Sequence, residues 1–300
     1  MTLVAAARKL IPPLKPQFHK GQLGRILVVG GCIDYSGAPY FACMASALAG
    51  SDMNHILCSQ DAGPVIKGYS PNLMVHPYLN EKTYNGNLDK RIPLLLDRIH
   101  VLVVGPGLGR EKAMVDQATA VIRHAQTRKI PVVIDADGLW IVANDLGLVK
   151  NTDTILTPNV VEFARLVAAA CVDPKTSTKT QAEALASILG VSLLVKGEHD
   201  IITNGKDTVF NDTLGSNRRV SGQGDTLSGT LATFLAWRLA YESGLWATER
   251  IDFDLTLVAA WAASSLTRTA SRLAFSQHGR GMVTTNVTEQ VPAAFRELFG

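Results

Sequence analysis

The sequence lacks any apolar run of the roughly 18 to 20 residues that crossing a bilayer requires. Its N-terminus also lacks the charged-then-apolar pattern of a secretion signal. Charge of one sign is nowhere concentrated, because 29 Lys and Arg are nearly balanced by 26 Asp and Glu, for a net charge of +3. We therefore expect a cytoplasmic protein that binds neither nucleic acid nor a membrane surface.

Cysteine is scarce, and the four present (Cys32, Cys43, Cys58 and Cys171) have no C-x-x-C spacing and no nearby histidine cluster. A zinc site and a disulfide framework are both disfavoured, and we expect small buried thiols in a reducing compartment. The first 33 residues contain no acid, so an organellar presequence and a mitochondrial pool are the alternative. Pro12, Pro13 and Pro16 argue against it, because they would interrupt an amphipathic helix.

The remaining composition favours a large α/β fold. A hydrophobic content of 47% over 300 residues suffices for one large core, so we expect one domain over 1–300, with 1–17 as an N-terminal extension or helix. Short β-branched runs alternate with segments of helical period, which is typical of a mainly parallel sheet with helices on both faces. The predicted strands cover 26–29, 55–58, 101–104, 131–134, 154–157 and 191–195.

Residues 200–203 and 208–210, with Asn204-Gly205 between them, predict a hairpin and so an antiparallel edge to the sheet. Helices are predicted over 114–125, over 227–235 and, as a buried helix, over 255–266. Most of the predicted strands run directly into Gly, Asp, Asn or Lys. In an open parallel sheet, ligands bind at the carboxyl ends of the strands, so we expect the functional site there.

A glycine-rich segment from Gly215 to Gly229 opens into one of these helices. Amides of Gly222, Gln223 and Gly224 at the helix N-terminus would form an anion hole for a phosphoryl group. Asp225 would then accept the proton of a substrate hydroxyl that attacks the phosphorus. The alternative is that Asp225 only caps the helix and the glycines only form a turn.

Two familiar nucleotide motifs are absent. The turn Gly105-Pro106-Gly107-Leu108-Gly109 has its third glycine one position too early for G-x-G-x-x-G, so a plain dinucleotide fold is disfavoured. No G-x-x-x-x-G-K-[ST] occurs, which excludes a Walker-type ATPase.

Two further segments have both a structural and a functional interpretation. Asn159 and Glu162 have the spacing of a capping box, but a carboxylate there would also hold water on Mg²⁺. No direct metal ligand is assigned. Lys196 ends a predicted strand and begins either a plain charged turn or a contact to nucleotide phosphate or ribose, with Asp135 and Asp137 lining the crevice nearby.

Taken together and in this order, the Gly-Pro-Gly-Leu-Gly turn, Asn-x-x-Glu, the Lys-Gly turn and Gly-Gln-Gly-Asp-Thr-Leu-Ser-Gly resemble the ribokinase-like superfamily, a three-layer αβα fold. The stretches Lys20-Gly21-Gln22, Tyr35 to Tyr40, Leu156 to Phe163 and Lys196 to Asp200 are similar to the eukaryotic ATP-dependent (S)-NAD(P)H-hydrate dehydratase family. The resemblance covers the chain from about Phe18 to its end.

The resemblance implies a repair enzyme that uses ATP and Mg²⁺ to return NADHX and NADPHX, the hydrated nicotinamide cofactors, to NADH and NADPH. Asp225 matches the catalytic base. The implied ATP-binding positions are Lys196, Gly197, Glu198, His199 and Asp200, together with Gly215, Ser216, Asn217, Arg218, Arg219, Val220, Ser221, Gly222, Gln223 and Gly224. The implied substrate-binding positions are Gly107, Asn159, Val160, Val161, Glu162, Phe163, Ala164, Arg165 and Asp225.

Bacterial relatives often carry His-Pro-Gly-Glu where this chain has Asn159-Val160-Val161-Glu162, and they commonly accept ADP, so we expect ATP as the donor here. They are often fused to an epimerase, for which this chain has no room, so a separate NAD(P)HX epimerase is the expected functional partner. A homo-oligomer is left open. The alternatives are a vitamin kinase resembling hydroxyethylthiazole or pyridoxal kinases, and a non-catalytic dinucleotide sensor.

Overall fold

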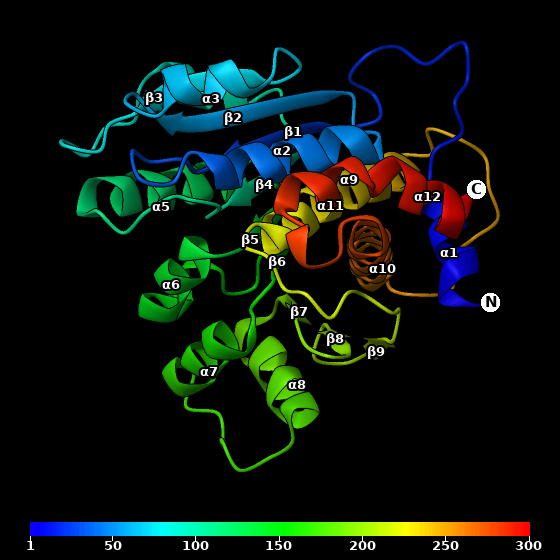
Figure 1. Cartoon of the computed structure of the whole chain (residues 1–300). Coiled ribbons are helices and arrows are strands. Elements are labelled where there is room, and N and C mark those ends of the chain that lie inside the picture. Colours follow the sequence, from blue (N-terminus) through cyan, green and yellow to red (C-terminus); the bar gives the residue numbers. More distant parts are fainter.

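The computed structural model describes all 300 residues and contains one nine-stranded sheet (Figure 1). Its strands are β1 (Arg25–Val29), β2 (Met53–Ser59), β3 (Met74–Leu79), β4 (Val101–Val104), β5 (Val132–Ile134), β6 (Thr154–Leu156), β7 (Ser192–Val195), β8 (Asp200–Thr203) and β9 (Thr208–Asn211). They lie in the order β3-β2-β1-β4-β5-β6-β7-β8-β9. The pairs from β3 to β7 are parallel, and β8 and β9 form an antiparallel edge, as predicted.

Helices cover both faces of the sheet, because both faces of its strands are apolar. In β1, Ile26 and Val28 belong to one buried core and Leu27 and Val29 to the other. The first core is completed by α1 (Leu3–Leu10), α2 (Gly37–Ala49), α3 (Gly63–Tyr69), α9 (Gln223–Glu242), α10 (Leu255–His278), α11 (Thr284–Glu289) and α12 (Val291–Phe299). The second is completed by α4 (Arg91–Leu96), α5 (Lys112–Thr127), α6 (Asp137–Asn144), α7 (Val160–Ala169) and α8 (Thr178–Leu189).

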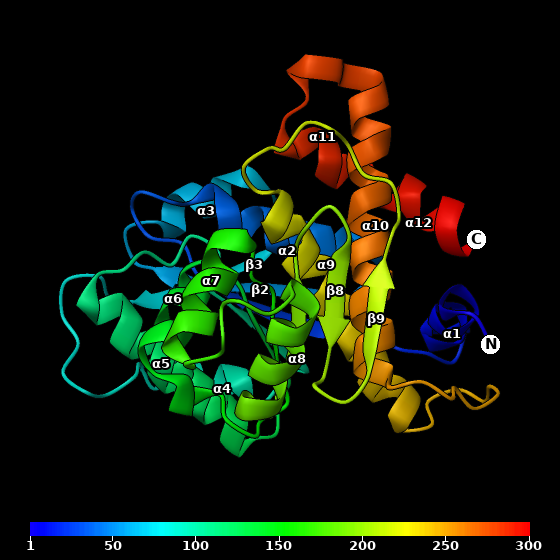
Figure 2. The same ribbon diagram turned by 90° about the horizontal axis from the view of Figure 1, so that it is seen from below.

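Helix α10 runs along β9, and the chain after β9 returns over α10 to the start of α9 (Figure 2). The two chain ends meet on the same side of the molecule, where α1 packs against α10 and α12. The Arg8 guanidinium donates to the carbonyl oxygens of Leu298 and Gly300, both at 3.4 Å. No helix has the length and apolar character that spanning a membrane would need.

The central helix α9 is fixed by an unusually close approach to α2. A Cβ atom on Gly229 would lie 1.8 Å from the carbonyl oxygen of Ala42, so only glycine allows these two backbones to meet. Most of the side chains of α9 are buried, including Phe234 and Trp237. The position of the α9 N-terminus over the sheet therefore depends on this contact.

All six predicted strands are present, with bounds shifted by a residue or two, and the connection between β8 and β9 is four residues long. Three expectations need correction. The strand β3 was not predicted, and α10 continues past 266 to His278. Cys171 is exposed rather than buried, because it ends α7 in a left-handed turn with φ 53°, whereas the other three cysteines are buried.

We expect Gly229→Val to lower the free energy of unfolding by about 3 kcal/mol, because the added methyls force α2 and α9 apart. Thermal denaturation followed by circular dichroism measures this. Gly68→Ala is the matched control, since nothing lies within 4 Å of a Cβ atom at that position in α3. An unchanged melting temperature in Gly229→Val would contradict the proposed role of this contact.

Candidate active site

The site lies where β5, β6 and β7 end side by side at the carboxyl edge of the sheet. Asp135 follows β5, Asn159 follows β6 after a short loop, and Lys196 follows β7. The N-terminus of α9 faces this edge and brings Gly224 and Asp225 to the same place. Residues that are distant in the sequence therefore lie together at one point. The polar residues at the strand ends had led us to expect the site at this edge.

Two clefts open here, and each has the size of a small-molecule site. The first has a volume of about 660 Å³ and is lined by Tyr35, Ala38, Gly107, Gly109, Arg110, Asp135, Ala136, Asp137, Asn159, Glu162, Lys196, Ser221, Gly222, Gly224 and Asp225. The second has a volume of about 630 Å³ and is lined by Asn159, Val160, Val161, Lys196, Gly197, Glu198, Asp200, Gly215, Ser216, Arg219, Val220, Gln223, Gly224, Leu227, Ser264, Thr267 and Arg268.

The two clefts meet at Asn159, Lys196 and Gly224, which line both. A ligand in one cleft can therefore react with a ligand in the other without leaving the protein. Most of the residues expected to bind ATP line the second cleft, whereas Asp225 lines only the first. This arrangement suits the transfer of a group from a nucleotide to a second substrate.

Asp225 is a buried carboxyl group, 9% exposed, and no protein group donates a hydrogen bond to its side chain. The N-cap of α9 is Gly222, so the interpretation of Asp225 as a helix cap is wrong. Burial raises the pKa of Asp225 to about 8, and the charge of Asp135 adds to this effect. A carboxyl with a pKa near neutrality is suited to accept and release a proton.

The N-terminus of α9 offers free backbone donors beside this carboxyl. The amides of Gly222, Gly224 and Asp225 donate to no group of the protein. Gln223 was expected to belong to this set, but its amide already donates to the carbonyl oxygen of Val220 at 3.4 Å. Free amides at the positive end of a 20-residue helix form an anion site, here at the meeting point of the clefts.

Lys196 is the cation at this meeting point. Its Nζ donates to Asp135 Oδ1 at 2.9 Å and lies 3.9 Å from Glu162 Oε2. Burial alone would lower the pKa of Lys196, but the charges of Asp135 and Glu162 outweigh it and raise the pKa. The ammonium group of Lys196 therefore stays charged. It lies where it can bind a phosphate that bridges the two clefts.

Glu162 caps α7, which is one of the two roles that the sequence allowed, and it also lines the first cleft. Its Oε2 accepts from the Asn159 amide at 2.8 Å, while Asn159 Oδ1 accepts from the amides of Val161 and Glu162, which completes a capping box. The same carboxylate lines the first cleft, where burial raises its pKa. No hydrogen bond reaches Oε1, so this oxygen remains available to a ligand.

Ala136 has a strained backbone, with φ 46° and ψ −120°, between two aspartates of the first cleft. Such a conformation costs a non-glycine residue roughly 1–3 kcal/mol and occurs mainly at functional sites. It turns the chain so that Asp135 and Asp137 both line the cleft. Gly105 leaves room for this turn, because its own Cβ would lie 1.8 Å from the Asp135 carbonyl oxygen.

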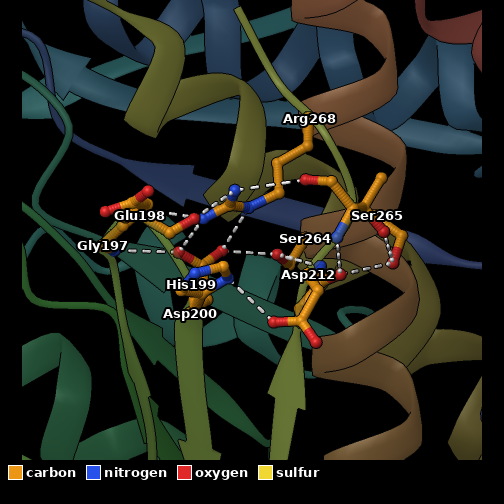
Figure 3. Close-up of polar contacts among 10 residues, drawn as sticks. Gly197, Glu198, His199, Asp200, Asp212, Ser264, Ser265 and Arg268 are labelled. Carbon is orange, nitrogen blue, oxygen red and sulfur yellow. Dashed lines mark hydrogen bonds and ion pairs between the residues drawn. The ribbon is translucent and has the colours of Figure 1, made fainter.

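Arg268 of α10 shapes the second cleft because its hydrogen bonds hold the turn after β7 in place (Figure 3). It makes a two-point ion pair with Asp200, with Nη2 to Oδ1 at 2.6 Å and Nε to Oδ2 at 3.0 Å. It also donates to the carbonyl oxygens of Gly197 and Glu198, at 2.7 and 2.9 Å. The Asp200 carboxylate therefore organises the wall of the cleft, while His199 points outward to Asp212 at 2.8 Å.

Comparison with known proteins agrees with this geometry. The family profile described as NAD(P)H-hydrate dehydratase matches residues 26–293. The chain is 42% identical, over 99% of its length, to the ATP-dependent (S)-NAD(P)H-hydrate dehydratase of Aspergillus fumigatus, of which it covers 94%. The chain belongs to the NAD(P)H-hydrate dehydratase family. The dehydratase of the same name from Danio rerio is 44% identical over 99% of this chain and 89% of its own.

Solved structures of low sequence identity to this chain share its fold. The ADP/ATP-dependent NAD(P)H-hydrate dehydratase of Bacillus subtilis, co-crystallised with ATP and Mg²⁺, has a TM-score of 0.71 at 19% identity and covers 98% of this chain and 97% of its own. A ribokinase-like superfamily protein from Enterococcus faecalis has a TM-score of 0.75 at 19% identity, covering 98% and 94%. The expected ribokinase-like fold is therefore confirmed.

Several residues expected to have a role in this dehydratase lie elsewhere. Phe163 was expected to bind substrate, but its ring is 5% exposed and packs in the core between the sheet and α7. Ala164 and Arg165 line neither cleft, because they face solvent on the same helix. Val160 and Val161 line the second cleft rather than the first. Asn217, Arg218 and His199, which were expected to bind ATP, also line neither cleft.

Other lining residues of the dehydratase site were not predicted. Arg110 directly follows the glycine turn after β4. This position was the only feature of the sequence that could have indicated that Arg110 lines the site. Ser264, Thr267 and Arg268 line the second cleft from α10, which was interpreted only as a buried helix. Their spacing of three and four residues places them on one face of that helix and could have revealed a polar stripe.

We expect Gly224→Leu to raise the dissociation constant for ATP by about tenfold or more. A Cβ atom there lies 3.4 Å from Lys196 Nζ, so a longer side chain fills the meeting point and displaces the lysine. Isothermal titration with ATP measures this, and Gly68→Leu, in open space on α3, is the control. Equal ATP affinity in the variant and the wild type would contradict the assigned anion site.

We expect Asp225→Asn to stabilise the ligand-free protein increasingly as the pH rises. The raised pKa means that the native state keeps a proton that the unfolded state loses, so wild-type stability falls between pH 3.8 and about 8. Asparagine carries no charge, and its advantage should grow across this window by up to about 1.4 kcal/mol per pH unit. Melting temperatures at pH 5, 6.5 and 8 test this. Asp116→Asn, on α5 and outside both clefts, is the control.

Proposed function

We propose that this protein dehydrates the S forms of NADHX and NADPHX to NADH and NADPH at the expense of ATP. The meeting of the two clefts beside Asp225 is the observation that carries the proposal. ATP lies in the second cleft with its terminal phosphate at Lys196 and the α9 amides. The hydrated ring lies in the first cleft with its hydroxyl at Asp225. The names of the relatives from Aspergillus fumigatus and Danio rerio support this choice of substrates.

The reaction proceeds in two steps. Asp225 takes the proton of the ring hydroxyl as that oxygen attacks the terminal phosphorus, and ADP leaves. The carbon–oxygen bond then breaks, and its electron pair leaves with the phosphate. The neighbouring ring carbon loses a proton to water, and its C–H electron pair forms the carbon–carbon double bond. The products are ADP, phosphate and the dihydropyridine, with no change of oxidation state overall.

The residues at the meeting point fit a magnesium ion that arrives with ATP. Mg²⁺ takes one or two carboxylates and completes its shell with phosphate oxygens and water. Glu162 Oε1, which accepts no hydrogen bond, and the neighbouring Asp135 would supply such oxygens, directly or through water. The ion would neutralise charge on the phosphates, while Lys196 and the α9 amides orient them.

The proposal also includes a partner enzyme and a location in the cell. The S form would be supplied from the R form by an epimerase, and we include that partner in the proposal. A cytoplasmic location, with the mitochondrial pool as the alternative, also belongs to it.

A small-alcohol kinase of the same fold is the competing function, and the product separates the two. A kinase releases a stable phosphorylated alcohol, whereas the dehydratase releases free phosphate. A non-catalytic sensor fits less well, because it has no use for an unpaired buried carboxyl beside free amides.

We expect Asp225→Asn to reduce turnover by about 10²- to 10⁴-fold while ATP still binds. The assay is the ATP-dependent recovery of absorbance at about 340 nm from NADHX. In the wild type, kcat/KM should rise with pH towards about 8, as Asp225 loses its proton. Asp116→Asn is the matched control. An active Asp225→Asn enzyme would remove Asp225 from the mechanism, and a wild type without ATP-dependent recovery would end the proposal.

A further inference from the structure

Arg110 lines the first cleft and not the second. It follows Gly109 in the turn after β4, whereas the residues shared by the two clefts come from the ends of β6 and β7 and from α9. It is the only arginine in the lining of the first cleft, and Lys196 is the only other cation there. The two cations therefore occupy different parts of the same site.

One edge of the Arg110 guanidinium group is hydrogen-bonded to the protein, and the other edge is free to bind a ligand. Its Nε donates to Asp137 Oδ1 at 3.0 Å, and Asp137 Oδ2 accepts from the Gly109 amide, also at 3.0 Å. The guanidinium carbon lies 5.6 Å from the centre of the Trp140 ring. Both Nη atoms and the Arg110 backbone amide make no hydrogen bond within the protein, and the side chain is 52% exposed.

The first cleft contains more carboxyl groups than cations, so a phosphate ligand there needs a cation with free hydrogen-bond donors. Its lining carries four carboxyl groups, Asp135, Asp137, Glu162 and Asp225, against two cations. Lys196 is already matched by Asp135 and Glu162. A dinucleotide brings a diphosphate, which carboxylates repel, so its entry needs a cation with free donors. The planar guanidinium fork fits phosphate oxygens by two parallel hydrogen bonds.

We propose that Arg110 binds a phosphate of the dinucleotide substrate and that Asp137 positions its guanidinium by holding Nε. This inference rests on the proposed function, which places the ring hydroxyl at Asp225 and so leaves the rest of the dinucleotide to the remainder of the cleft. Two phosphates share the required chemistry. The diphosphate is present in both NADHX and NADPHX, and the 2′-phosphate is present only in NADPHX.

The test compares steady-state kinetics of Arg110→Gln and the wild type with NADHX and with NADPHX. We expect KM for the hydrate to rise by about 10- to 100-fold, the usual cost of a lost charge-assisted contact, with kcat and the KM for ATP nearly unchanged. A rise for both hydrates assigns the diphosphate, and a rise for NADPHX alone assigns the 2′-phosphate. Arg110→Lys, which keeps the charge without the fork, should recover part of the loss.

Arg123→Gln is the matched control, because Arg123 forms an exposed pair with Asp145 at 3.9 Å and lines neither cleft. Melting temperatures check that each variant is folded. The inference is overturned if KM for both hydrates stays within about twofold of the wild type, or if only kcat falls. In either case an active wild type leaves the proposed function standing, whereas a wild type that dehydrates neither hydrate overturns both.

Discussion

The chemistry of this protein depends on a carboxyl group buried at the opening of α9 without a hydrogen-bond partner. Burial and the nearby Asp135 raise the pKa of Asp225 to about 8, so the group is poised to exchange a proton near neutral pH. Such a group weakens the fold, and it is tolerated because α9 is anchored elsewhere. The glycine contact between α2 and α9, together with the buried side chains of α9, holds the helix in place.

The division of the site into two clefts explains how a kinase-like fold can support a lyase. Lys196, Asn159 and Gly224 belong to both clefts, so a phosphate at that point is accessible from either side. A simple kinase releases the ester that it makes. Here the acceptor is a ring whose phosphate ester leaves readily and restores conjugation. ATP therefore drives the removal of water, and the protein mainly has to align the two substrates and move one proton.

The parallel sheet, its antiparallel edge and the position of the site were predictable from the sequence, because β-branched runs and polar strand ends are local signals. The edge strand β3 was missed, since His76 and Pro77 break its apolar pattern. Neither the burial of Phe163 nor the free amide of Asp225 could be predicted, because both depend on how α7 and α9 pack. The role of α10 in the second cleft is likewise a product of tertiary contacts.

The most direct test of phosphoryl transfer follows the oxygen atom of the ring hydroxyl. NADHX labelled with ¹⁸O at that position is converted with unlabelled ATP, and the released phosphate is analysed by mass spectrometry. The account predicts that the label appears in phosphate, because the carbon–oxygen bond breaks after the phosphorus–oxygen bond has formed. Label found in water, with unlabelled phosphate, would mean that ATP hydrolysis and dehydration are separate events and would contradict the account.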